Sequence, residues 1–201
     1  MSDSVAFSHM HPVDDPKWTD AEVIEASWED SARFRVIFER YYPQIRGYLI
    51  RRAGFEIGSE AAADTFVEAF QSRKRYDLSY PSAKPWLFGI ATNLLRNHFR
   101  REATSKRLTV ADDTPTSDFA DDVAWRADAE RLVQESGLLG AISALRQEER
   151  DVLFLYAFGD LTYEEIGDAL TIPTGTVRSR LSRLRKKLRR SLRTALEGGE
   201  T

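Results

Sequence analysis

The residues of this chain best suited to chemistry form a run of cations near its C-terminal end. Between Thr171 and Leu196 there is no Asp or Glu, but there are nine basic residues: Arg178, Arg180, Arg183, Arg185, Lys186, Lys187, Arg189, Arg190 and Arg193. The whole chain has a net charge of −3. DNA affinity depends on the field at the contact surface, because phosphates are neutralised and counterions released there. A charge run is often only a solvated helix face, but the unbroken sign favours a nucleic-acid-binding segment.

These cations lie on the second of two predicted helices. Thr162 and Glu165 form a capping box at the start of the first, whose inner face is Ile166, Ala169 and Leu170. The residue before Pro173 avoids helical geometry, so this helix ends there. Thr174 caps the next helix, whose inner face is Val177, Leu181, Leu184, Leu188 and Leu192. The pattern predicts a helix-turn-helix whose second helix enters the DNA major groove.

The second helix also offers the polar groups that DNA recognition needs. Backbone amides and hydroxyls at its head suit a phosphate, and an arginine facing the groove can donate two bonds to a guanine edge. An ordinary helical hairpin with a basic solvent face is the alternative. The predicted DNA contacts are Thr174, Thr176, Arg178, Ser179, Ser182, Arg183, Lys186 and Lys187.

Upstream, helical periodicity recurs and strand signals are nearly absent. One apolar stripe comprises Phe34, Ile37, Phe38, Tyr41, Ile45, Tyr48 and Leu49. Pro43 should kink that helix or break one turn. A second helix, with Ser59 as its cap, carries Ala62, Ala63, Phe66, Val67 and Phe70. After a turn at Tyr80-Pro81-Ser82, a third carries Trp86, Leu87, Ile90, Leu94 and Leu95.

These patterns predict an all-α protein with two small helical domains and a flexible acidic linker. The linker contains TVADDTPTSDFADD, a polar, acidic and Pro-containing stretch that cannot bury enough surface to order itself. The expected boundaries are a disordered tail over 1–18, an N-terminal domain over 19–102 and the linker over 103–124. A C-terminal domain of four short helices follows over 125–196, and 197–201 form a tail.

Four segments together resemble a known family. YEEIGDALTIPTGTVRSRLSRLRKKL resembles region 4 of the sigma-70 family, in the extracytoplasmic-function (ECF) group. FERYYPQIRGYLIRR, EAAADTFVEAFQ and AKPWLFGIATNLLRNHFRR resemble, in order, the first, polymerase-binding and promoter-melting helices of region 2. The similarity extends from about Asp20 to Ser191. It implies a sigma factor that binds core RNA polymerase, reads the minus-ten element with region 2 and reads the minus-thirty-five element with region 4.

The resemblance also implies roles for residues of the N-terminal domain. Asn93 matches a residue that helps to capture a flipped-out base, and Trp86 matches the aromatic residue that heads the same helix. Their alternatives are an exposed polar residue and a core aromatic. The implied minus-ten contacts are Trp86, Asn93, Arg96, Asn97, Arg100 and Arg101.

The implied polymerase-binding residues are Glu60, Asp64, Phe66 and Glu68. Alanines at 61–63 and Asp64 depart from the family pattern, which puts the docking contacts in question. The expected partners are the coiled coil of the largest polymerase subunit, the flap of the second-largest subunit, promoter DNA and an anti-sigma factor. No catalytic residue, metal or cofactor is expected.

Composition excludes several other classes of protein. The chain has 201 residues and no cysteine, so disulfides and thiolate metal sites are ruled out. No apolar run approaches the roughly 20 residues that cross a bilayer, and the acidic N-terminus is unlike a secretion signal. We therefore expect a cytoplasmic protein without membrane insertion.

Two rival functions fit parts of the sequence. A stand-alone transcription regulator could carry a similar helix-turn-helix, but it would not need the frame from Trp86 to Asn93. An enzyme would have to use His9, His11 or His98, and no phosphate loop, nucleophile elbow or paired-carboxylate site accompanies them.

Overall fold

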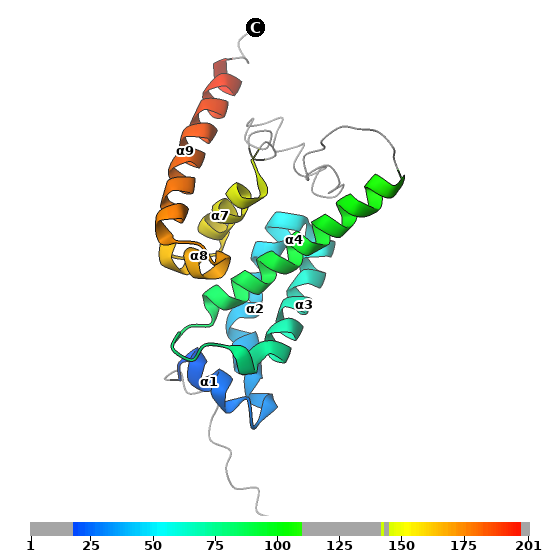
Figure 1. Cartoon of the computed structure of the whole chain (residues 1–201), viewed down its shortest axis with the longest axis vertical. Coiled ribbons are helices and arrows are strands. Elements are labelled where there is room, and N and C mark those ends of the chain that lie inside the picture. The colour runs from blue at the N-terminus through cyan, green and yellow to red at the C-terminus, as the bar shows by residue number, and fades with distance from the viewer. Residues whose placement is uncertain (1–17, 110–141, 143–144, 198–201) are drawn as a thin grey trace, which may run out of the picture.

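The computed structural model describes residues 18–109, 142 and 145–197, and within these ranges the chain forms helices joined by turns (Figure 1). The N-terminal half contains α1 (Asp20–Ala26), α2 (Arg35–Ala53), α3 (Phe55–Ser72) and α4 (Lys84–Thr109). Short 3-10 turns, η1 (Ser31–Phe34) and η2 (Arg73–Arg75), precede α2 and follow α3. The C-terminal half contains α7 (Gln147–Phe158), α8 (Tyr163–Leu170) and α9 (Thr174–Glu197). The all-α prediction is confirmed.

Helices α2 and α3 form a tight hairpin, which differs from the sequence-based expectation in two places. Pro43 lies inside α2, which continues past it, so the helix does not end there. Ser59 does not cap α3, which begins four residues earlier, directly after Gly54. Gly54 has φ 78°, a left-handed conformation that glycine adopts without strain, so it allows the sharp reversal between the helices. At Gly58 a Cβ atom would lie 2.6 Å from the backbone of Ile50, so α3 approaches α2 where it has no side chain.

Helix α4 runs further than the sequence pattern predicted. It continues to Thr109, whereas we expected the linker to begin at 103. Residues 103–109 mix good helix formers (Ala, Lys, Arg and Leu) with Thr and Ser, and they contain no Gly or Pro that would stop the helix. The rest of the expected linker, the helix expected near Trp125 and most of the two tails lie outside the described residues.

Helix α1 is fixed to the other N-terminal helices through one buried carboxylate. Asp20 is 4% exposed. It accepts hydrogen bonds from Arg40 at 2.8 Å, the Tyr41 hydroxyl at 2.5 Å and the backbone amide of Ala83 at 2.7 Å. Burial and the bond to Asp20 raise the pKa of Tyr41 to about 12. Asp20 therefore joins α1, α2 and the turn before α4.

The two halves share a hydrophobic core instead of standing apart. Helix α4 packs on α2 and α3, and α8 packs on α4, so that α4 lies between them (Figure 1). Its residues Leu87, Phe88, Ala91 and Leu95 are fully buried. At Gly89 a Cβ atom would lie 2.8 Å from the carbonyl oxygen of Ala169, which brings the backbone of α8 against α4.

Candidate nucleic-acid interface

The helix-turn-helix is built by local hydrogen bonds that the sequence predicts. The Thr162 hydroxyl accepts from the Glu165 amide at 3.2 Å, and the Thr162 amide donates to the Glu165 carboxylate at 2.7 Å, so the capping box is confirmed. Helix α8 ends at Leu170, and the residue that caps it, Thr171, has φ 55°. A Cβ atom at Gly167 would lie 2.8 Å from the Ile172 carbonyl oxygen, so this glycine lets the turn close tightly over α8.

Helix α9 has one buried face and one cationic face. Val177, Leu181 and Leu184 are at most 2% exposed, as the spacing predicted. The opposite face exposes Arg178, Ser179, Ser182, Arg183, Lys186 and Lys187, while Thr174 and Thr176 at its head are half-buried. Arg183 lies back along the helix and donates to the carbonyl and hydroxyl oxygens of Ser179 at 3.3 and 3.4 Å. This face presents donors and positive charge to solvent, as major-groove readout requires.

A shallow hollow of about 310 Å³ lies beside this face, lined by Tyr163, Arg178, Leu181, Ser182, Arg185 and Lys186. It adds Arg185, a residue that we did not predict as a DNA contact. Arg185 donates to the hydroxyls of Tyr156 at 3.2 Å and Tyr163 at 3.3 Å, and the bond to Tyr163 raises the pKa of Arg185. Arg185 belongs to the basic run, so its charge alone made it a candidate DNA contact. Only the tertiary structure shows that Tyr156 of α7 and Tyr163 of α8 lie beside it.

The predicted minus-ten contacts occupy one side of α4. Trp86 is half-buried, and its ring packs 5.0 Å from that of Tyr76. Asn93, Asn97, Arg100 and Arg101 are exposed, and Arg100 donates to the Asn97 side chain at 3.1 Å. Trp86 thus has both a packed and an accessible part, which suits the aromatic edge of a base pocket.

Arg96 differs from these neighbours because the C-terminal half of the chain binds it. Its Nε donates to Asp151 of α7 at 2.6 Å, and its guanidinium forms an ion pair with that carboxylate. Asp151 is fully buried. Burial and the nearby Arg52 lower the pKa of Arg96. The structure therefore places this predicted DNA contact in an internal ion pair.

The predicted polymerase-binding residues are divided between surface and core. Glu60, Asp64 and Glu68 are exposed on α3. Phe66 is only 6% exposed and lies under Phe38, with ring centroids 5.0 Å apart, so it cannot supply the exposed apolar group expected of it. Val67, 54% exposed, takes that place, with Phe38 nearby at 39%. From the spacing of apolar residues in α3, either Phe66 or Val67 could face the core. Packing against Phe38 of α2 places Phe66 there and leaves Val67 on the surface.

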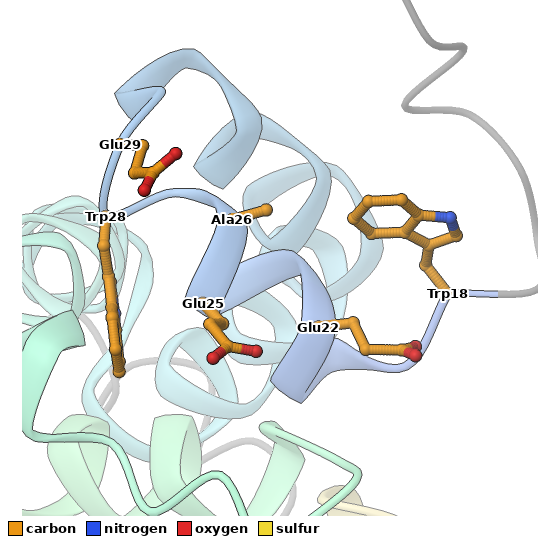
Figure 2. Close-up of a pocket in the computed structure, with 6 residues that line it drawn as sticks. All are labelled: Trp18, Glu22, Glu25, Ala26, Trp28 and Glu29. Atoms are coloured by element: carbon orange, nitrogen blue, oxygen red, sulfur yellow. The ribbon is translucent and has the colours of Figure 1, made fainter.

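The surface of α1 has the opposite charge to α9. A hollow of about 470 Å³ is lined by Trp18, Glu22, Glu25, Ala26, Trp28 and Glu29 (Figure 2). Figure 2 shows the two indoles on opposite sides of α1 and the carboxylates between and beside them. Three carboxylates repel phosphate, so this end of the molecule does not suit DNA.

Within residues 18–109 and 145–197, no group of His, Asp and Glu side chains is arranged to hold a metal ion. None of the helices in this part of the chain has the length and apolar character needed to cross a membrane.

Known proteins match the chain in both halves. The family model for Sigma-70 region 2 matches residues 37–104, and that for Sigma-70 region 4 matches residues 137–188. ECF RNA polymerase sigma factor RpoE of Cereibacter sphaeroides is 26% identical over 172 residues, 81% of this chain and 88% of the relative. RNA polymerase sigma factor HrpL of Pseudomonas syringae is 34% identical over 133 residues, 63% of this chain and 68% of the relative.

A solved structure agrees at the level of the fold. The structure of the sigma factor RpoE of Bartonella quintana, solved in complex with the anti-sigma factor NepR, superposes with a TM-score of 0.57 at 19% sequence identity. The superposition covers 80% of this chain and 96% of the RpoE chain. One conclusion follows from the order of the two matched regions, from the helix-turn-helix and from the relatives that match most of the chain. The chain belongs to the sigma-70 family of RNA polymerase sigma factors, in the ECF group, and directs promoter-specific transcription initiation.

Proposed function

We propose that this sigma factor divides promoter reading between two helices. The exposed face of α9 reads the minus-thirty-five element as duplex DNA, with Arg178, Ser179, Ser182 and Arg183 toward the bases. The face of α4 that carries Trp86 and Asn93 takes an unstacked base of the minus-ten element. The observation that carries the proposal is the pairing of an exposed cationic recognition helix with a half-buried tryptophan two turns before an exposed asparagine.

The two helices suit different forms of DNA. Arginines on an exposed helix can enter the major groove and donate to base edges. Extracting a base costs a few kcal/mol, which stacking on an aromatic side chain and hydrogen bonds to the base edge offset. Trp86 and Asn93 supply those two kinds of contact on α4.

Binding to the polymerase is assigned to the exposed part of α3 and its surroundings. Glu60, Asp64 and Glu68 offer carboxylates, and Val67 with Phe38 offers the apolar contact that Phe66 does not. We infer a cytoplasmic protein without catalysis of its own, because RNA synthesis belongs to the core enzyme. An anti-sigma partner is also proposed, since the RpoE of Bartonella quintana is solved with one.

The test is transcription with purified core polymerase on a promoter that neither component uses alone. Asn93→Ala should leave binding to the closed duplex unchanged and reduce permanganate reactivity in the bubble, because its base partner exists only after melting. Gln44→Ala, which removes an exposed amide from α2, is the matched control and should behave as the wild type. Sequence-specific DNA binding by the chain alone, with no binding to core polymerase, would instead identify a stand-alone regulator.

A further inference from the structure

The start of α4, the helix that carries Trp86 and Asn93, lacks the local side chains that usually cap a helix. The Leu87 amide donates to the Ala83 carbonyl at 3.0 Å, so Ala83 stands directly in front of the first turn. An alanine side chain has no oxygen that can accept from the first amides. Trp86 occupies the third helical position, where a capping box has the Glu or Gln that accepts from the amide of the cap residue. The Ala83 amide therefore has no acceptor from the residues of a capping box.

Asp20 of α1 supplies that acceptor from 63 residues away in the sequence. Its carboxylate accepts from the Ala83 amide at 2.7 Å, and its own amide donates to the Pro81 carbonyl at 3.0 Å. Asp20 is 4% exposed, so water competes little for these bonds. A carboxylate beside the first turn also interacts favourably with the positive end of the helix dipole. Asp20 thus does for α4 what a glutamate in place of Trp86 would do within the helix.

The carboxylate of Asp20 is held in place by α2. One of its oxygens accepts from Arg40 at 2.8 Å, and the other accepts from the Tyr41 hydroxyl at 2.5 Å as well as from Ala83. Turning this carboxylate would leave a buried charge or a buried donor without its partner, which is costly. The direction of the cap is therefore fixed by two helices that precede α4 in the chain.

The other side of the same loop is tied to Trp86 through Tyr76. The Tyr76 ring packs 5.0 Å from the Trp86 ring, and the Tyr76 hydroxyl donates to the Tyr80 carbonyl at 2.6 Å. The segment between η2 and α4 is thus held near its start by Tyr76 and at its end by Asp20. Trp86 lies in the first turn of α4, and the first turn is where a helix frays. Loss of the cap would therefore loosen the residue that is proposed to stack on a base.

We propose that Asp20 is a positioning residue for the reading of the minus-ten element. By capping α4 from α1, it keeps the first turn helical and holds Trp86 where an unstacked base can stack on it. Asp20 is buried and does not itself contact DNA. The proposal rests on the assignment of minus-ten reading to the face of α4 that carries Trp86 and Asn93.

Three variants separate positioning from general stability. Asp20→Ala removes the cap, whereas Asp20→Asn keeps an oxygen for the Ala83 amide and loses the ion pair with Arg40. Val23→Ala is the matched control in the same helix. Val23 is 1% exposed, so its truncation loosens the packing of α1 and leaves every bond of Asp20 in place. Helix α1 keeps its own capping box, formed by Thr19 and Glu22, in all three variants.

The measurement uses the holoenzyme on a duplex promoter with a fluorescent base analogue in the minus-ten element. Its kinetics separate the affinity of the closed complex from the rate at which the DNA opens. Asp20→Ala should slow opening about fivefold, the usual effect of losing one helix cap, and leave the affinity of the closed complex unchanged. Asp20→Asn should slow it only about twofold, because a neutral acceptor keeps about half of the strength of a charged one. Val23→Ala should be less stable in urea and open DNA at the wild-type rate.

Two outcomes would overturn the positioning role. One is a wild-type opening rate in Asp20→Ala, and the other is equal slowing in Asp20→Ala and Val23→Ala, which would trace the defect to stability alone. If Asp20→Ala does not fold, Asp20→Asn is compared with Val23→Ala under the same criteria. Normal opening in Asn93→Ala would instead reject the assignment of minus-ten reading to α4. Slow opening in Asn93→Ala with normal opening in Asp20→Ala would reject only the role of Asp20.

Discussion

The two surfaces proposed to read DNA differ in how much of each is accessible. The face of α9 is exposed, with its apolar stripe buried beneath it and its arginines in solvent. The face of α4 is partly covered, with α8 against Gly89 and Arg96 paired to a fully buried carboxylate. The proposed recognition helix for duplex DNA is thus exposed over its whole polar face, while the surface proposed for melted DNA is partly covered by the C-terminal half.

The difference has a physical basis in what each surface binds. Duplex DNA exists before initiation, so an exposed α9 can search for it at once. An exposed base pocket and a free guanidinium on α4 would bind other single strands and polyanions. Covering α4 reduces such binding and gives the two halves a common core.

The largest expected effect comes from removing the charge on which that cover depends. Asp151 of α7 forms a buried ionic cluster with Arg52 of α2 and Arg96 of α4. Asp151→Ala leaves both arginines without their shared carboxylate, and the free energy of unfolding should fall by up to about 3–5 kcal/mol. Urea denaturation followed by circular dichroism measures this. Asp168→Ala on α8 is exposed and should stay within about 0.5 kcal/mol of the wild type. Equal stability of the two variants would mean that the cluster does not hold the halves together.

An intermediate effect should follow from altering the uncovered surface. Arg183→Ala should weaken holoenzyme binding to the minus-thirty-five element by about 1–3 kcal/mol and change the preferred base, if Arg183 contacts guanine. Lys187→Ala should weaken all sequences about equally and reduce the salt dependence of binding. Selection from a randomised duplex, repeated at two salt concentrations, separates these outcomes. An unchanged base preference in Arg183→Ala would place the reading face elsewhere on α9.

The smallest effect is expected at a second ion pair between the halves. Lys84 lies 3.4 Å from the carboxylate of Asp160, whose side chain is 98% exposed. The Lys84 side chain is 14% exposed and also donates to the backbone carbonyl of Asp160. Because the carboxylate of the pair stands in solvent, we expect it to contribute about 0–1 kcal/mol, so Lys84→Ala should change the urea midpoint little. A loss as large as that of Asp151→Ala would show that exposed contacts, and not the buried cluster, close the molecule.

The sequence alone determined the parts of this protein that depend on neighbours along the chain. The capping box at Thr162 and Glu165, the break before Pro173 and the inner face of α9 were predictable because each involves residues a few positions apart. The family resemblance identified both halves for the same reason, since its motifs are local. The extension of α4 to Thr109 is also a local property, because residues 103–109 contain no Gly or Pro. The lack of an apolar stripe in this stretch favoured a linker instead.

Only the tertiary structure decided which predicted contacts are accessible. Phe66 and Val67 are adjacent on α3, and packing against Phe38 buries one and exposes the other. Arg96 and Asp151 are 55 residues apart, and no local pattern reveals that they meet. Charges and apolar side chains lose or keep their water according to what folds against them, and the segments that fold together here lie far apart in the sequence.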